Sequence, residues 1–159
     1  MLLYHGTWEY TYEKILEEGE IKCFGTVASD TTKIINEILN EYGTEINLRE
    51  GAIFLTDDIE GVEAYDYAFV LDINKLNIDL LYVADFHHST KLYDYVMRGI
   101  EDKNEVKQIV KKYEDSYMDF NEYLQRKEDF IFPEFLYYGD IPLDAIKVLS
   151  DNDIINIGS

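Results

Sequence analysis

The chain has 159 residues, of which 47% are hydrophobic and 14% aromatic, so it suits one compact domain over residues 1–159 and is not a disordered protein. Its formal net charge of −19 argues against nucleic acid as the main partner, because nucleic-acid binding usually needs a clustered basic surface. One interpretation of this negative charge is that it keeps the protein soluble. The other is that it binds a basic protein partner or mimics a nucleic acid.

The expected location is the reducing cytoplasm, because the single cysteine, Cys23, cannot form an internal disulfide. No apolar run approaches the roughly 20 residues needed to cross a bilayer. The start of the chain is too polar for a secretory signal, since Glu9 and Glu13 follow almost at once. We therefore expect no membrane association.

Short apolar runs and amphipathic segments alternate in the first third of the chain. Here we predict a strand over residues 2–5, a helix with Tyr12, Ile15 and Leu16 on one face that ends at Gly19, a short return over 20–22, and a helix to Gly43 capped by Asp30 or Thr31.

The remaining two thirds continue this mixture. The pattern predicts strands over 51–55, 68–73, 129–138 and 145–149, a short acidic helix over 57–66 capped by Thr56, and helices near 89–98 and 103–118; residues 80–84 are ambiguous and the chain from 151 onward is a loose end. Strands at both ends with helices between them predict an α+β fold. The alternation is too irregular for a doubly wound parallel sheet.

His5 stands where the first apolar run stops, and Gly6 and Thr7 follow it. A glycine at a strand end lets the backbone come close to a ligand. An imidazole, an approachable backbone and a hydroxyl group together can hold a sugar and an amide. The alternative is a structural histidine.

Glu134 lies far downstream, directly after Pro133 and within an aromatic run. If it faces a site of low polarity, its charge interacts strongly with any cation that forms there. The alternative is an outward position on an edge strand.

Two aromatic residues, Phe54 and Tyr65, can offer flat surfaces to an aromatic ring or pack in the core. The pair His87 and His88 would point to opposite faces of a strand, and no set at ligand spacing accompanies it, so we expect no metal site. Cys23 has no evident activating partner, and the chain carries neither a phosphate-binding glycine loop nor a serine-hydrolase elbow.

Three blocks, residues 3–7 (LYHGT), 51–57 (GAIFLTD) with Tyr65, and 133–142 (PEFLYYGDIP), resemble in this order the motifs of the ADP-ribosyltransferase superfamily. The resemblance is to its His-Tyr-Glu branch, which includes poly(ADP-ribose) polymerases, diphtheria-toxin-like enzymes and small bacterial and phage transferases. It implies a split, mainly antiparallel sheet with flanking helices and a cleft for NAD⁺.

By this resemblance, His5 holds a ribose hydroxyl, the Gly6 backbone pairs with the nicotinamide amide, and Tyr65 stacks on nicotinamide. Thr7 and Phe54 belong to the same NAD⁺-binding set, and Glu134 is the catalytic glutamate. Cleaving the bond to nicotinamide develops an oxocarbenium-like cation, which a carboxylate stabilises as in glycoside hydrolysis. NAD⁺ is the co-substrate and no metal is needed.

The chain departs from the family pattern at two positions. Phe54 stands where the family usually has tyrosine, and Phe132 stands where the arginine-modifying toxins have a carboxylate or glutamine. The pyrophosphate has no obvious basic clamp, although Arg49 and Lys22 are candidates.

We therefore expect a mono-ADP-ribosyltransferase whose target is a protein, one of basic character if the acidic surface recruits it. Two alternatives stay open: a nucleic-acid-modifying enzyme, as in DarT-like toxins or tRNA 2′-phosphotransferases, and a non-enzymatic acidic binding or inhibitor module. A toxin, a phage effector and a regulatory enzyme are all compatible settings.

Overall fold

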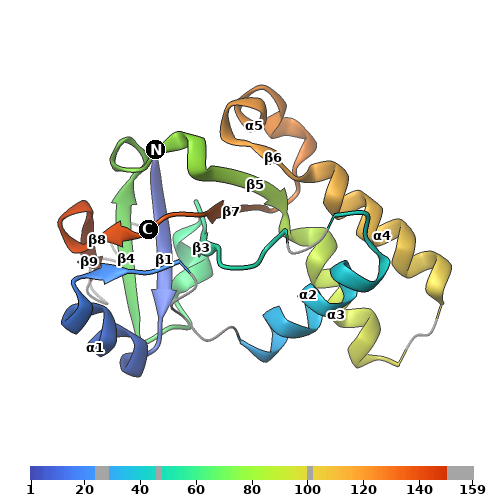
Figure 1. Ribbon diagram of the computed structural model, residues 1–159, viewed down its shortest axis with the longest axis horizontal. Coiled ribbons are helices and arrows are strands. Elements are labelled where there is room, and N and C mark those ends of the chain that lie inside the picture. The colour runs from blue at the N-terminus through green and yellow to red at the C-terminus, as the bar shows by residue number, and fades with distance from the viewer. Residues whose placement is uncertain (24–28, 46–47, 100–101, 150–159) are drawn as a thin grey trace. The chain divides into compact units, whose positions relative to one another are not determined.

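A computed structural model describes residues 1–23, 29–45, 48–99 and 102–149 (Figure 1). Helices and antiparallel strand pairs make up the described chain, which confirms the predicted α+β fold. The chain divides into two compact units, each built from separate segments: unit 1 is Met1–Thr26, Gly51–Leu81 and Phe135–Ser159, and unit 2 is Val27–Glu50 and Tyr82–Glu134. The single domain over 1–159 and the transferase-type split sheet stay predictions.

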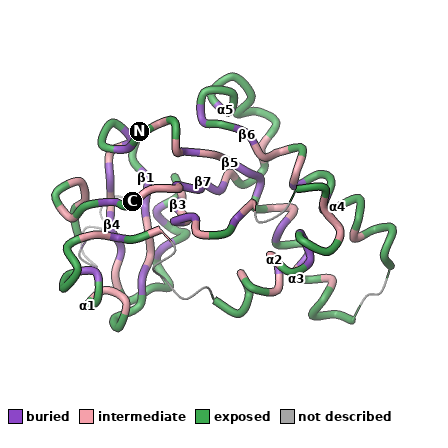
Figure 2. The backbone as a smooth tube through the Cα atoms, viewed as in Figure 1, coloured by how far each residue is buried: buried purple, intermediate pink, exposed green. Residues whose placement is uncertain are grey.

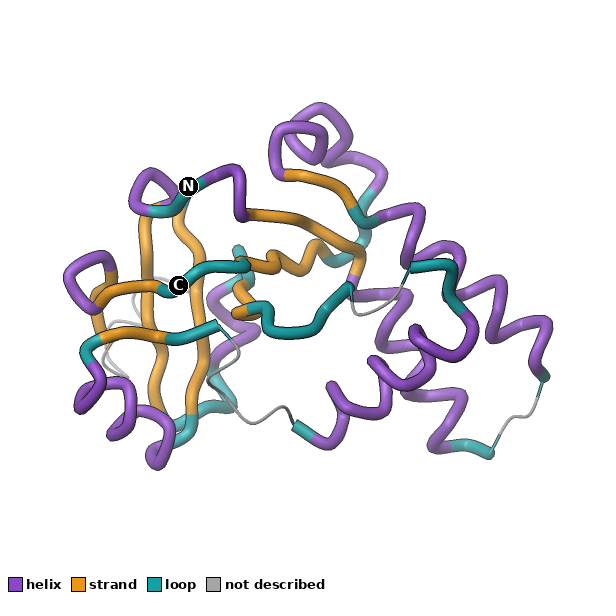
Figure 3. Tube along the Cα trace, in the orientation of Figure 1, coloured by secondary structure: helices purple, strands orange, loops and turns teal. Residues whose placement is uncertain are grey.

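Unit 1 holds most of the strands. Its elements are β1 (Leu2–Thr7), α1 (Glu9–Glu18), β2 (Glu20–Ile21), β3 (Ile53–Leu55), the 3-10 helix η1 (Ile59–Val62), β4 (Tyr67–Asp72), the 3-10 helices η2 (Ile73–Lys75) and η3 (Ile78–Leu80), β8 (Ile141–Pro142), η5 (Leu143–Ala145) and β9 (Ile146–Leu149). Strand β4 lies between β1 and β9 and is antiparallel to both. Figure 3 draws the strands in orange. Strand β2 pairs with β8, and β3 pairs with residues 135–137.

Apolar side chains of β1 and β4 build much of the core of unit 1. Leu3 on β1 and Phe69 and Leu71 on β4 are fully buried, as the purple stretches of Figure 2 show for these strands. Gly19 ends α1 in the left-handed conformation (φ 77°), and its N–H donates to the Ile15 carbonyl. The predicted apolar face of α1 is only partly right, because Ile15 is buried while Leu16 is exposed.

Unit 2 holds most of the helices. Its elements are α2 (Asp30–Tyr42), α3 (Phe86–Met97), α4 (Lys103–Ser116), β6 (Met118–Asp119), α5 (Phe120–Arg126) and η4 (Lys127–Asp129). Helix α3 packs on both α2 and α4. Ser29, one residue before the predicted caps, accepts a hydrogen bond from the Thr32 N–H and so begins α2.

Two strands pass from one unit to the other: β5 (Leu81–Asp85), which settles the ambiguous 80–84 segment, and β7 (Pro133–Tyr137). The segment predicted as an acidic helix from Thr56 is shorter, because Asp58 caps the single turn of η1. Helix α5 was not predicted. Residues from 151 onward lie outside the described chain.

The predicted strand over 129–138 begins only at Pro133 because an earlier aspartate engages the preceding backbone. Both oxygens of the buried Asp85 carboxylate accept N–H groups, from Ile131 at 2.9 Å and from Phe132 at 3.0 Å. The same carboxylate caps α3 by accepting the His87 N–H. His87 and His88 therefore lie in the first turn of a helix, and the prediction that they point to opposite faces of a strand is wrong.

Cys23 contacts an acidic side chain. Its thiol lies 3.3 Å from a carboxylate oxygen of Asp140, to which it donates. None of the helices in the described part of the chain has the length and apolar character to span a membrane.

Candidate functional site

His5 lies on β1, two residues before the strand ends at Thr7, and is fixed by a backbone carbonyl of β3. Its Nδ1 lies 2.8 Å from the Phe54 carbonyl oxygen, and because a carbonyl only accepts, Nδ1 carries the proton and donates it. The ring stacks on Phe69, its partner across the strand pair, with centroids 6.5 Å apart. Burial lowers the pKa of His5, and the bond to Phe54 offsets part of that shift. The imidazole is therefore neutral at pH 7, with Nε2 as a hydrogen-bond acceptor.

Gly6 turns its backbone toward the edge of β1 that faces away from β4. Tyr4 exchanges both backbone hydrogen bonds with Thr56 on that edge, at 2.7 and 2.9 Å. Backbone groups alternate along an extended strand, so the N–H and C=O of Gly6 point to the same edge as those of Tyr4. This places one donor and one acceptor where a carboxamide could bind both.

Tyr65 covers Gly6 from above the strand. A Cβ atom on Gly6 would lie 2.6 Å from the Cγ atom of the Tyr65 ring, so only glycine fits here. Tyr65 is itself 40% exposed and contacts Trp8, with ring centroids 4.8 Å apart. The alternative that Tyr65 is a core residue is thus wrong. Trp8 was not predicted, although its place directly after the LYHGT block was the available signal.

The other two predicted NAD⁺-binding residues are placed differently. Phe54 is half-buried, and its main-chain carbonyl is the group that holds His5. Thr7 is buried, which favours packing over contact with a sugar. Unit 1 therefore brings His5, Gly6, Phe54 and Tyr65 together at the end of β1.

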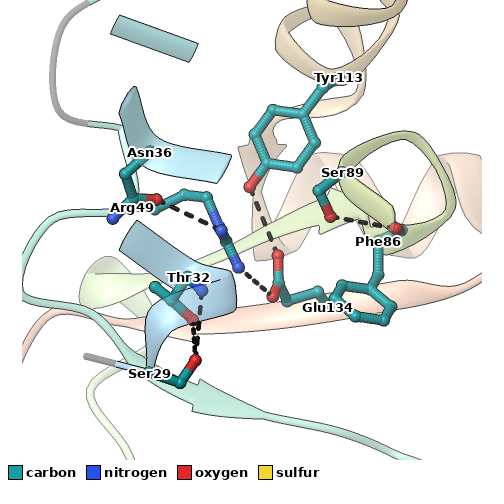
Figure 4. Close-up of polar contacts among 8 residues, drawn as sticks. All are labelled: Ser29, Thr32, Asn36, Arg49, Phe86, Ser89, Tyr113 and Glu134. Carbon is teal, nitrogen blue, oxygen red and sulfur yellow. Dashed lines mark hydrogen bonds and ion pairs between the residues drawn. The ribbon is translucent and has the colours of Figure 1, made fainter. Parts of the chain in front are cut away.

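Glu134 belongs to unit 2 and is buried in an ionic cluster (Figure 4). Its Oε1 accepts a hydrogen bond from Arg49 Nη2 at 2.8 Å, and its Oε2 accepts one from the Tyr113 hydroxyl at 3.4 Å. The alternative of an outward position on an edge strand is therefore wrong. A carboxylate has about four lone-pair sites, so both oxygens keep capacity for a further donor.

Arg49 is as buried as the glutamate it contacts. Its side chain is 3% exposed, and Nη1 donates to the Asn36 Oδ1 atom of α2 at 3.3 Å. The contact with Glu134 explains why the charged Arg49 side chain is buried. From the sequence, Arg49 was only a candidate for contact with the pyrophosphate. Arg49 also forms part of the wall of a pocket of about 280 Å³ in unit 2, together with Asn36, Asn40 and Lys33.

Tyr113 completes the cluster from α4. Its ring and hydroxyl are fully buried. Burial raises the pKa of Tyr113 well above its usual value, and the charge of Glu134 raises it further. The hydroxyl stays protonated and is a permanent donor to the glutamate.

The contacts of Arg49 and Tyr113 with Glu134 were not predicted from the sequence. The role of Asp85, which accepts the backbone N–H groups just before Pro133, was not predicted either. Asp85 offered a signal, since an aspartate before a helical pattern is a typical cap. Arg49 and Tyr113 offered none, because their separations of 85 and 21 residues from Glu134 carry no local pattern.

No group of three or more His, Cys, Asp or Glu side chains that could hold a metal ion occurs within the described residues. His88 Nε2 lies 3.9 Å from Asp85, and burial lowers the pKa of His88.

Comparisons with known proteins add no relative to these observations. No protein-family model matches the chain, no curated protein matches it, and no solved structure matches it.

Proposed function

We propose that the protein is a mono-ADP-ribosyltransferase, which cleaves NAD⁺, transfers ADP-ribose to a macromolecular target and releases nicotinamide. The observation that carries the proposal is the arrangement at the end of β1. A neutral His5 with an acceptor nitrogen, the outward backbone edge of Gly6 and the partly exposed ring of Tyr65 match what a ribose hydroxyl, a carboxamide and a pyridinium ring require.

Each residue has one role in the proposed reaction. His5 Nε2 accepts a hydrogen bond from a ribose hydroxyl, Gly6 pairs with the nicotinamide carboxamide, and Tyr65 stacks on the nicotinamide ring. These contacts hold the sugar in one orientation, which lowers the entropic part of the barrier.

Glu134 has the role of stabilising charge. The bond between ribose C1′ and the nicotinamide nitrogen breaks, and its electron pair leaves with nicotinamide. The cation that develops on the sugar is stabilised by the carboxylate, which also accepts a bond from the ribose 2′-hydroxyl. A nucleophile of the target then bonds to C1′ and loses its proton to solvent or to a base.

The net charge of −19 supports a protein target of basic character over a nucleic acid. The cytoplasm is the proposed compartment, because a chain with one cysteine needs no oxidising environment.

The test is incubation with labelled NAD⁺ and host lysate, followed by intact-mass analysis of the labelled protein and an assay for free nicotinamide. We expect a mass gain of one ADP-ribose unit, and loss of both signals in Glu134→Gln. No transfer and no nicotinamide release would refute the enzyme. Label found in DNA or RNA would favour the nucleic-acid-modifying alternative, and full activity of Glu134→Gln would remove Glu134 from the mechanism.

A further inference from the structure

We infer that Arg49 is a positioning residue for Glu134, which it holds in one orientation for the reaction; this inference rests on the proposed function. Arg49 Nη2 contacts Oε1 of Glu134 at 2.8 Å, and the two side chains are 3% and 9% exposed. The resemblance assigns Arg49 no role of this kind.

The geometry fixes the carboxylate from several sides. Arg49 donates to Oε1, and Tyr113 donates to Oε2. Asn36 of α2 in turn accepts from Arg49 Nη1, so the guanidinium plane is itself oriented. A carboxylate bonded at both oxygens cannot rotate freely about its last torsion, and its remaining lone pairs point in set directions.

Burial makes the cation necessary. A charge that is withdrawn from water is costly unless an opposite charge or hydrogen-bond donors compensate it. Arg49 is the cation in contact with the buried Glu134, so the position of the carboxylate depends on this pair.

If Arg49 were only structural, it would need only to neutralise the charge of Glu134. A positioning role and a structural role therefore differ in their effect on the kinetics. Loss of orientation lowers kcat while leaving KM for NAD⁺ nearly unchanged, because the buried guanidinium of Arg49 contacts Glu134 and Asn36 and is not available for the pyrophosphate contact considered from the sequence. The variant Arg49→Lys separates the structural role from the positioning role. The lysine ammonium keeps the positive charge, but it lacks the planar set of N–H donors with which a guanidinium orients a carboxylate.

The test measures nicotinamide release by the wild type, Arg49→Lys and the matched control Arg98→Lys. Arg98 lies in the same unit and is largely exposed, with an ion pair to Asp94. We expect Arg49→Lys to lose about 100-fold in kcat, with KM for NAD⁺ within about twofold of the wild type. Circular dichroism at the assay temperature verifies that each variant is folded. Arg98→Lys should match the wild type.

A second variant keeps the test decisive if the lysine is poorly accommodated. Arg49 lines the 280 Å³ pocket, so Arg49→Ala leaves a cavity that opens to it. Added methylguanidinium should enter and restore at least a tenth of the lost kcat, whereas methylammonium should not.

Three results are contrary to the inference. Arg49→Lys with kcat within about threefold of the wild type removes the positioning role, and so does a folded Arg49→Ala that methylguanidinium does not restore. Both leave the proposed function standing. A wild-type protein that releases no nicotinamide overturns the function and this inference together.

Discussion

The end of β1 and the surroundings of Glu134 are built in opposite ways. Near the end of β1 the polar groups offered to a ligand depend on main-chain atoms: His5 is held by the Phe54 carbonyl, and Gly6 presents its own backbone edge beneath a partly exposed ring. Around Glu134 the contacts from Arg49 and Tyr113 each join two side chains, and all three side chains are buried. The first region is shaped by strand geometry, and the second by compensation of charge.

This difference determines what each region tolerates. The backbone edge of β1 depends on the absence of a side chain at Gly6, because a larger residue there would displace Tyr65 and block access to the backbone. An ionic cluster depends on the presence of every partner, because a buried charge without its counterpart is costly. Substitutions in the two regions test this contrast.

The largest effect is expected in the ionic cluster. Arg49→Leu leaves Glu134 buried without its cation and should lower the free energy of unfolding by about 3–5 kcal/mol. Arg49→Leu combined with Glu134→Leu should recover most of that loss, because no charge is left unpaired. Urea unfolding followed by circular dichroism measures both, with the exposed Arg98→Leu as a control expected within about 0.5 kcal/mol. A single variant as stable as its control would contradict the cluster's role.

Gly6→Ala should have the next largest effect. The added methyl would lie 2.6 Å from a Tyr65 ring carbon, so the ring must move, at a cost of about 1–3 kcal/mol. If the proposed function holds, KM for NAD⁺ should rise as well. Gly61→Ala is the matched control, because its methyl would meet Thr56 no closer than 3.4 Å. Equal stability of the two variants would show that Tyr65 does not restrict this position.

Tyr113→Phe should have a smaller effect, because it removes one long hydrogen bond of 3.4 Å and keeps the ring. We expect a loss of about 0.5–1.5 kcal/mol in unfolding free energy. The loss of kcat should be well below that of Arg49→Lys, since the shorter bond from Arg49 fixes the carboxylate. A larger loss of kcat in Tyr113→Phe would reverse the ranking of the two partners.

The smallest effect concerns pH. Burial lowers the pKa of His5 below its ordinary 6.5, so the unfolded chain binds the proton more readily than the folded protein does. The stability that depends on neutral His5 is present above pH 6.5 and is lost as the pH falls through the lowered pKa. His88 contributes in the same direction, because burial lowers its pKa too.

His5→Gln isolates the share of His5 in this pH dependence. The glutamine amide can still donate to the Phe54 carbonyl but does not titrate. Its unfolding free energy, measured by urea titration above and below pH 6.5, should fall less steeply than that of the wild type. An unchanged slope would assign the pH dependence to other groups.

The contrast also explains what the sequence could predict. The helix end at Gly19, the strand predicted over residues 2–5 and the amphipathic α2 follow from local patterns. The strand continues to Thr7, so His5 lies two residues before its end. The burial of Glu134 was predictable only as one of two alternatives, because strand alternation does not state which face is covered.

What could not be predicted depends on distant pairs. The contact of Arg49 with Glu134 spans 85 residues, and the contact of Tyr65 with Gly6 depends on how η1 ends. Strand β7 begins later than predicted because the Asp85 carboxylate accepts the N–H groups of Ile131 and Phe132, which a strand would use for pairing. Tertiary hydrogen bonds thus overrode a local preference that was otherwise correct.

The contact of Cys23 with Asp140 has a practical consequence for labelling. Burial raises the pKa of this thiol, and the neighbouring carboxylate raises it further, so little of it is present as the reactive thiolate. A cysteine introduced at an exposed position, such as Arg98→Cys, should react with a maleimide much faster than the native thiol. A fluorophore could then be attached at one chosen position without removing the only natural cysteine of the chain.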